Sequence, residues 1–245
     1  MKTASNPAGQ TVIFNESAHT YTCGKTQLES GTTFVGRFFP KFESDKVATI
    51  YAKKRKLKKA DVLAMWAAKG EAASAFGNKI HEYAEQVVKG ESHKIKWEVS
   101  ERESRYRMYV DMALHKIEKD FKFMEPEMII FSEKLGKAGM LDLPTTDKKN
   151  NDLVIWDWKV NEKIEKENFW QNCLHPISHL QAAKFNKYQL QLNFYNKICE
   201  VENYYDVLKN RCRMGLIHLT ETGPVFLKVE NMRGDIDNML AWGDI

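Results

Sequence analysis

The sequence predicts an α/β fold, with a mixed central sheet flanked by helices and an N-terminal hairpin and helical extension. Short runs rich in β-branched and aromatic residues alternate with longer segments of helical periodicity. With 245 residues and 43% hydrophobic content, the chain can bury one substantial core. We therefore expect an extension over residues 1–70 and a core domain over residues 71–245.

The N-terminal segments 11–15 and 19–22 predict a hairpin, and helical signals dominate from about residue 32 to residue 89. Separate helices are predicted around 64–68 and over 72–88. A further amphipathic helix is predicted over 104–121, because apolar residues repeat there at helical spacing. These residues are Tyr106, Tyr109, Val110, Ala113 and Ile117.

Three strands are predicted in the middle of the chain. Residues 127–133 form the first, a turn is expected at 136–139, and residues 140–143 return antiparallel to it. The run 153–156 follows a turn-like segment, is rich in β-branched and aromatic residues, and is too short for a helix. It therefore predicts a buried strand that continues the meander.

The carboxylates of this meander indicate a metal site. The predicted pairing sets Asp142 beside Asp157, and alternation along the strand puts Asp157 and Lys159 on one face with Trp158 on the other. Two neighbouring carboxylates repel each other unless a cation lies between them, and oxygen ligands suit Mg²⁺ or Mn²⁺. Lys159 could orient or deprotonate a water, or neutralise charge on a phosphate. A surface strand end with a salt bridge is the alternative interpretation of Asp157-Trp158-Lys159.

Four elements in sequence order resemble the motifs of one nuclease family. They are Gly77 to Glu85, with the G-x-x-x-H pattern ending at His81; Gly139 to Asp142, with G-x-x-D; Asp157-Trp158-Lys159; and Tyr188 to Tyr195, with Y-x-x-Q-x-x-x-Y. Together they resemble the RecB-like, Cas4-like branch of the PD-(D/E)XK nuclease superfamily, which includes phage exonucleases and the mitochondrial genome maintenance exonuclease. Leu141 stands where the superfamily name has proline, and Gly31 stands where a β-branched residue is more usual.

The resemblance implies a restriction-endonuclease-like core and a Mg²⁺- or Mn²⁺-dependent deoxyribonuclease. It implies hydrolysis of phosphodiester bonds as an exonuclease without strong sequence preference, in phage-type recombination, replication or repair. The metal ligands would be His81, Asp142, Asp157 and the carbonyl of Trp158. Lys159 would position the water, and Gln191 with Tyr195 would support the site. A structure-selective or nicking endonuclease, and a non-catalytic nucleic-acid-binding module with a degenerate site, are the alternatives.

Three candidate residues have ordinary structural interpretations as well. His81 lies one helical turn from Glu85, which suits a ligand and its hydrogen-bonding partner, but a lone helical histidine is commonly structural. Glu133, on the strand before Asp142, could bind a second metal, act in the outer shell, or be a charge at a strand end. Tyr188 shares a helix face with Gln191 and Tyr195, which could hold Lys159 or a phosphate, or be the wet edge of an amphipathic helix.

The distribution of charge along the chain suggests a nucleic-acid contact, whereas the net charge of the chain does not. Lys and Arg exceed Asp and Glu by only 37 to 33, but residues 53–59 are densely basic. A basic helix next to a metal site would suit a phosphate backbone, and a solvated helix face would look similar. The predicted DNA-binding residues are Lys53, Lys54, Arg55, Lys56 and Tyr188. A single-strand annealing or recombination protein is a further candidate partner.

The spacing of the cysteines indicates which metal cofactors to expect, and the N-terminal sequence indicates the cellular compartment. Cys23, Cys173, Cys199 and Cys212 are widely spaced, so neither a zinc ribbon nor an iron–sulfur cluster is expected. The N-terminus lacks an apolar segment of signal-peptide length, and no run is long enough to span a membrane. We expect a cytoplasmic protein without a membrane partner, located in the host cytoplasm if it is phage-encoded.

The C-terminal half contains one irregular segment and one further hairpin. Residues 163–187 lack periodicity, and within them Trp170 could stack a base or anchor a loop. Residues 214–219 and 225–229 predict a hairpin across 220–223, followed by a short terminal helix.

Overall fold

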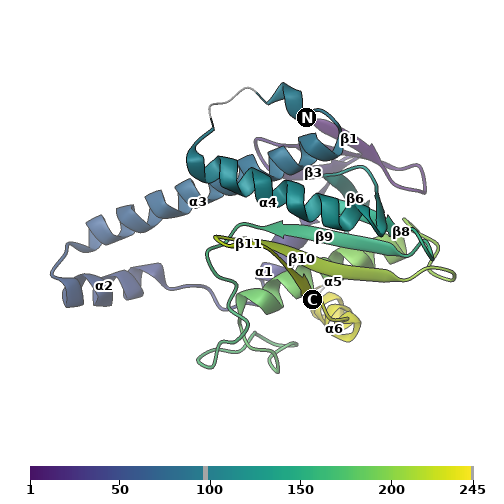
Figure 1. Ribbon diagram of the computed structural model, residues 1–245. Coiled ribbons are helices and arrows are strands. Elements are labelled where there is room, and N and C mark those ends of the chain that lie inside the picture. The colour runs from purple at the N-terminus through teal and green to yellow at the C-terminus, as the bar shows by residue number, and fades with distance from the viewer. Residues whose placement is uncertain (96–98, 244–245) are drawn as a thin grey trace.

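The structure is a computed structural model that describes residues 1–95 and 99–243. Within these residues the chain forms two mixed sheets and six α-helices, so the predicted α/β class is confirmed (Figure 1). None of the helices in these two stretches is both long enough and apolar enough to cross a bilayer.

The first sheet combines the N-terminal strands with a hairpin from the middle of the chain. Its order is β1 (Lys2–Ser5), β2 (Thr11–Asn15), β3 (Thr20–Cys23), β4 (Thr26–Ser30), β7 (Lys137–Leu141) and β6 (Met128–Ser132). All neighbours are antiparallel except β4 and β7, which pair in parallel. The N-terminal strands therefore share a sheet with β7, one residue before the predicted ligand Asp142.

The second sheet contains the strand that carries Asp157. Its order is β11 (Gly223–Lys228), β10 (Cys212–Thr220), β9 (Leu153–Lys159), β8 (Leu143–Asp147) and β5 (Phe121–Phe123). β9 pairs in parallel with β10 and antiparallel with β8. Only Asp142 separates β7 from β8, so the chain leaves one sheet and enters the other at this carboxylate.

The helices cover these sheets and carry the remaining candidate residues. They are α1 (Gly31–Gly36), α2 (Ser44–Arg55), α3 (Lys59–Val88), α4 (Glu101–Glu118), α5 (Lys184–Val201) and α6 (Arg233–Gly243), with a 3-10 turn η1 (Ser92–Lys94). α5 packs against β6, β7 and β10, and α4 packs on the other face of β10 and β11 (Figure 1).

The strand alternation of β9 divides the two main hydrophobic clusters. Leu153 and Ile155 point into the cluster that contains α1, α5 and α6, whereas Trp158 points into the cluster with α3 and α4. Asp157 has the same parity as Ile155 and therefore faces the α5 side of the sheet. The predicted alternation of Asp157 and Trp158 is confirmed.

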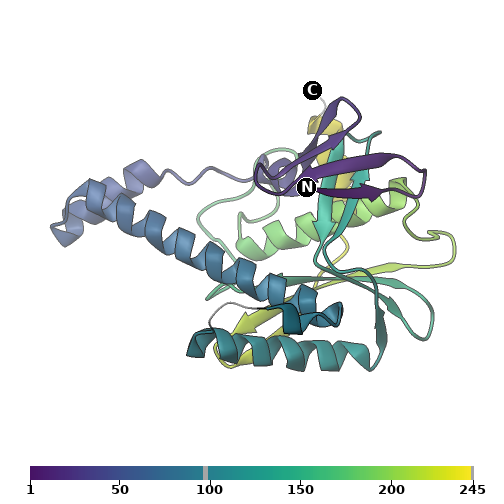
Figure 2. The same ribbon diagram turned by 90° about the horizontal axis from the view of Figure 1, so that it is seen from above.

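A two-helix arm projects from the body of the molecule. α2 and the first half of α3 extend away from both sheets in the two views (Figures 1 and 2). Only Ala48, Ala52 and Val62 are fully buried between the two helices. The segments predicted as separate helices near 64–68 and 72–88 belong to one uninterrupted helix, which runs through residue 70, where a boundary was expected.

Candidate metal centre

Three potential metal ligands meet between α3 and the two sheets. His81 lies on the body end of α3, between the fully buried Ile80 and the buried Ala84. Its Nδ1 is 3.4 Å from Asp142 Oδ2 and 4.0 Å from Glu127 Oε1. The three donor atoms all lie within 4.8 Å of one another. The structure therefore brings His81 and Asp142 together as predicted, and it adds Glu127.

The donor set fits a hard divalent cation. Oxygen and nitrogen ligands at about 2.1 Å from an octahedral ion are about 3 Å apart when adjacent and about 4.2 Å apart when opposite. The separations of 3.4 and 4.0 Å lie within this range. Two carboxylates suit Mg²⁺, and one imidazole makes Mn²⁺ equally acceptable.

Glu127, which the sequence prediction missed as a ligand, takes the place expected for Glu133. The predicted turn at 136–139 would set Glu133 opposite Asp142. In the structure the turn falls at 133–136, and Met128 pairs with Leu141, so Glu127 is the residue opposite Asp142. The Glu127 N–H donates to the Asp142 carbonyl at 3.1 Å. Gly136, with a φ of 63°, is the residue that could have located the turn.

Glu133 is not part of the centre. It is exposed at the opposite end of β6, about 20 Å along the strand from Glu127. Its carboxylate accepts a hydrogen bond from the side chain of Gln10. The prediction that Glu133 binds metal is therefore corrected to Glu127.

Asp157 lies on the neighbouring strand and is held by Lys159. The two side chains form an ion pair, and Asp157 is buried. The Trp158 N–H between them donates to Asp142 Oδ2 at 2.9 Å, which joins the end of β9 to the bend between β7 and β8. Asp157 does not belong to the three-residue cluster, but it lies close enough to Asp142 and His81 to be affected by their charges.

Burial, together with the crowding of acidic groups, perturbs the pKa values of carboxylates in and beside the centre. Burial, followed by repulsion from Asp142 and Glu85, raises the pKa of Glu127 to about 8. Burial also raises the pKa of Asp157 to about 6, although the Lys159 ammonium opposes the shift. Both carboxylates are therefore unfavourable as anions in this arrangement. A cation between them would remove that cost.

Lys159 is held as an ammonium ion. Burial alone would lower its pKa, but the carboxylates of Asp157 and Asp142 outweigh burial and raise the pKa above its usual range. The ammonium also lies over the ring of Tyr188, 4.7 Å from its centroid. The Tyr188 hydroxyl donates to Asn161 Oδ1 at 2.9 Å. These contacts favour a hydrogen-bond donor over a base at position 159.

The α5 face predicted to support the site does contact the strands of the centre. Gln191 Nε2 donates to the Tyr195 hydroxyl at 3.1 Å, and burial raises the pKa of Tyr195. A Cβ at Gly139 would lie 2.9 Å from Tyr195 Cδ1, and one at Gly31 would lie 2.6 Å from Tyr195 Cε1. Both glycines therefore leave space for the tyrosine ring against the backbone. This accounts for Gly31, where the resemblance would place a β-branched residue.

A long open groove leads to the centre. Its volume is about 1530 Å³, and its wall includes His81, Glu127, Trp158 and Lys159. One side follows α3 from Trp66 to Glu85, which is about 29 Å at the rise of an α-helix. The other side includes Asn161, Glu162, Lys163 and Glu165, at the start of the irregular segment.

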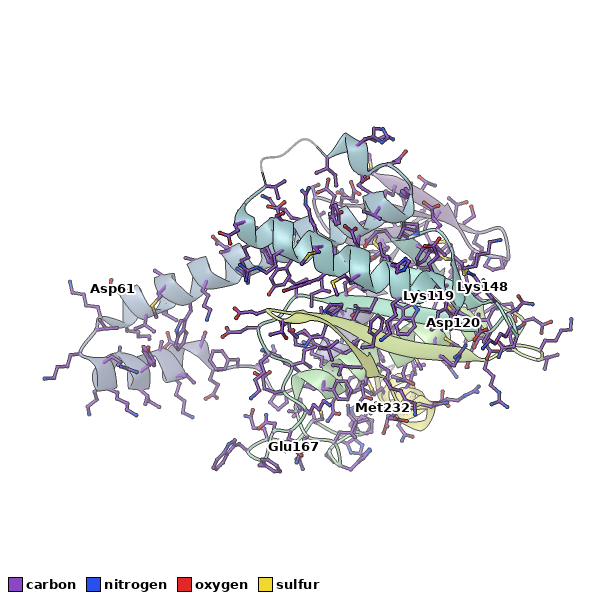
Figure 3. The ribbon with its side chains drawn as sticks, viewed as in Figure 1. Asp61, Lys119, Asp120, Lys148, Glu167 and Met232 are labelled. Carbon is purple, nitrogen blue, oxygen red and sulfur yellow. The ribbon has the colours of Figure 1, made fainter. Side chains whose placement is uncertain are left out.

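The basic segment does not lie next to the centre, contrary to the prediction. Lys53, Lys54, Arg55 and Lys56 are at the outer end of the arm, near Asp61 (Figure 3). His81 follows Lys59 by 22 residues of the same helix, which is about 33 Å. Trp170, for which stacking on a base and anchoring of a loop were both considered, lies outside the groove wall and is 93% exposed.

Comparison with known proteins adds no relative. No model of a protein family matches the chain, and no curated protein is similar enough to match it.

Proposed function

We propose that this protein is a Mg²⁺- or Mn²⁺-dependent deoxyribonuclease of the PD-(D/E)XK superfamily with a restriction-endonuclease-like core. The observation that carries the proposal is the cluster of His81, Glu127 and Asp142 next to the Asp157–Lys159 pair. One imidazole, three carboxylates and one ammonium lie together, and His81, Glu127 and Lys159 of this group line the groove. Three of the four sequence motifs supply His81, Asp142, Asp157 and Lys159, Glu127 comes from outside the motifs, and the fourth motif packs behind them.

Each residue of the centre has its own role in the proposed reaction. His81, Glu127 and Asp142 would hold the cation, with Asp157 beside it, and the cation would activate a water and offset charge on the phosphate. Lys159 is oriented by Asp157 and Tyr188, so its ammonium can donate to the water or to a phosphate oxygen. The Trp158 N–H fixes the Asp142 carboxylate, and its carbonyl stays the predicted fourth ligand.

The size of the groove supports a polymeric substrate. Pockets for small molecules have volumes of about 300–1,000 Å³, whereas this groove has about 1530 Å³. DNA hydrolysis without strong sequence preference follows from the resemblance, as does a role in phage-type recombination, replication or repair. A single-strand annealing or recombination protein stays the proposed partner.

Asp157→Ala tests the catalytic assignment. Cleavage of labelled DNA in Mg²⁺ or Mn²⁺ should be abolished, because the variant loses the carboxylate that orients Lys159. Binding of the same DNA in EDTA should be unchanged. Unaltered cleavage by Asp157→Ala would end the proposal, and Glu133→Gln serves as the control that should keep full activity.

The mode of cleavage is tested on duplexes labelled at the 5′ or 3′ end. An exonuclease should release mononucleotides from a free end and should leave an end-blocked duplex intact. Ladders of products from the end-blocked duplex would instead assign a structure-selective or nicking endonuclease.

A further inference from the structure

The outer end of the arm carries most of the excess positive charge of the molecule. Residues 44–61 contain seven basic and two acidic side chains, whereas the whole chain has a net charge of +4. The remainder of the chain is therefore close to neutral. Asp61 marks this end in Figure 3, far from both sheets.

Five of these seven basic side chains do not stabilise the fold through ion pairs, whereas Lys46 is paired with Glu43 and Lys59 with Asp45. Among the described residues, Lys53, Lys54, Arg55, Lys56 and Lys58 have no acidic side chain within ion-pair distance, and all five are exposed. The basic residues in the last turn of α2 complement its dipole. Lys58, at the N-terminus of α3, opposes the dipole of that helix, which costs stability, whereas the neighbouring Lys59 is paired with Asp45. A ligand of negative charge would offset this cost.

The groove by itself is a poor attractor for a polyanion. Five basic and six acidic side chains line it. Lys159 is paired with Asp157, and Lys184 is paired with Glu165 at 3.2 Å. Attraction of a phosphate backbone must therefore come mainly from outside the groove, and the arm is the strongly basic surface that adjoins it.

The spacing of the arm from the metal centre matches one turn of duplex DNA. Lys59 and His81 are 22 residues apart on one helix, or about 33 Å. One turn of B-DNA is about 34–36 Å, or about 10 base pairs, and phosphates return to the same face with this period. A duplex that lies along α3 would present one phosphate to the metal centre and others to the arm.

We propose that the substrate is duplex DNA and that the basic end of the arm binds its phosphates one helical turn from the bond that is cleaved. This inference rests on the proposed nuclease function, because that function is what places a phosphate of the duplex at the metal centre. It assigns the α2–α3 arm as a second, sequence-independent DNA contact. It also sets a minimum duplex length of about ten base pairs for full affinity.

The test compares two matched triple variants in EDTA, where no cleavage occurs. The arm variant is Lys53→Gln, Lys54→Gln and Lys56→Gln. The control is Lys119→Gln, Lys122→Gln and Lys149→Gln, which removes the same charge from exposed positions; Lys119 and Lys148 mark that end of the molecule in Figure 3. Binding is measured by fluorescence anisotropy on duplexes of about 6 and about 16 base pairs and on a single strand.

The arm variant should lose at least about tenfold in affinity for the long duplex and nothing for the short one. The slope of its log binding constant against log salt concentration should become less negative by up to about three, which is about one for each lost phosphate contact. The control variant should bind both duplexes as the unmodified protein does. Far-UV circular dichroism should be identical for all three proteins.

Three results would overturn the inference: unchanged binding of the long duplex, an equal loss on both duplexes, or an equal loss on the single strand. Its failure is distinguishable from failure of the nuclease proposal. If the unmodified protein cleaves DNA but the arm variant binds normally, only the arm inference fails. If no metal supports cleavage but length-dependent binding through the arm persists, only the nuclease function fails.

Discussion

One residue of the centre, Glu127, has an unusual backbone conformation. Glu127 has a φ of 52° and immediately precedes β6, and its carboxylate reaches His81 across the end of the hairpin. Non-glycine residues with positive φ are uncommon and are found where the surrounding structure holds them in place. Here the Glu127 N–H is fixed by the carbonyl of Asp142.

The role of Glu127 is tested by a pair of substitutions on the same strand. Glu127→Gln should weaken the response to Mg²⁺ or Mn²⁺, measured as the cation concentration for half-maximal rise in Tm, by at least about tenfold. Glu133→Gln removes an equivalent carboxylate from the other end of β6 and should leave this response unchanged. Equal effects of the two substitutions would exclude Glu127 as a ligand.

The raised pKa of Glu127 predicts how stability depends on pH. Its folded pKa of about 8 exceeds the unfolded value near 4.5, so the folded state binds the proton more tightly. Stability contributed by this group is present below the unfolded pKa and is lost as pH rises toward the folded value. The Tm of the metal-free protein should therefore fall between about pH 5 and about pH 8 more steeply than that of Glu127→Gln.

Bound cation should reverse this trend, because it favours the ionised carboxylates. The rise in Tm caused by Mg²⁺ should be larger at about pH 8 than at about pH 5. A rise that is independent of pH would show that Glu127 does not titrate together with cation binding. Differential scanning fluorimetry over this pH range measures both effects.

At the scale of the elements, the strand register determines which residues reach the site. The sequence was sufficient to predict which residues of β9 share a face. Once Leu153 to Trp156 is recognised as a strand, alternation places Asp157 on the face opposite Trp158. The sequence was not sufficient for the β6–β7 pairing, because Lys134 to Gly139 contains two glycines and either can end a turn. β1, β4, β5 and β8 were also not predicted, since each is short and gains its order from neighbouring strands.

Some site residues could likewise be predicted from the sequence, and others could not. His81, Asp142 and Lys159 were predictable, because each lies within a motif that resembles one of the nuclease motifs. Glu127 was not, because its position depends on a turn elsewhere in the hairpin. The arm was also not predicted, since helical periodicity does not report where a helix leaves the body of a protein.

The contact of α5 with β7 predicts the effect of a methyl group. Gly139→Ala should destabilise the protein by about 1–3 kcal/mol, because the new Cβ overlaps the Tyr195 ring. Gly77→Ala is the matched control: no atom lies near its Cβ, and alanine in the interior of α3 should stabilise by about 0.5–1 kcal/mol. Urea unfolding measures both changes. A neutral Gly139→Ala would contradict the described packing.

At the scale of the whole molecule, the N-terminal segment belongs to the body that holds the site. β4 pairs with β7, α1 packs on α5, and α3 carries His81 from the arm into the centre. The sequence suggested an extension over 1–70, because composition does not reveal that β4 completes a sheet with a strand more than 100 residues later.

This integration predicts that the C-terminal part will not fold alone. A fragment of residues 71–245 lacks β4 and α1, which leaves the edge of β7 unpaired and one side of α5 uncovered. It should show no cooperative thermal transition by circular dichroism under conditions where the full chain does. A fragment that melts with the Tm of the full chain would show that residues 1–70 are a separate unit.

The continuity of α3 has a mechanical consequence. One uninterrupted helix of 30 residues bears the imidazole of His81 near one end and begins beside the basic residues 53–58 at the other. Seating a duplex against the far end would fix the tilt of the helix and with it the orientation of the His81 ring. By thermodynamic reciprocity, the factor by which DNA tightens cation binding must equal the factor by which the cation tightens DNA binding.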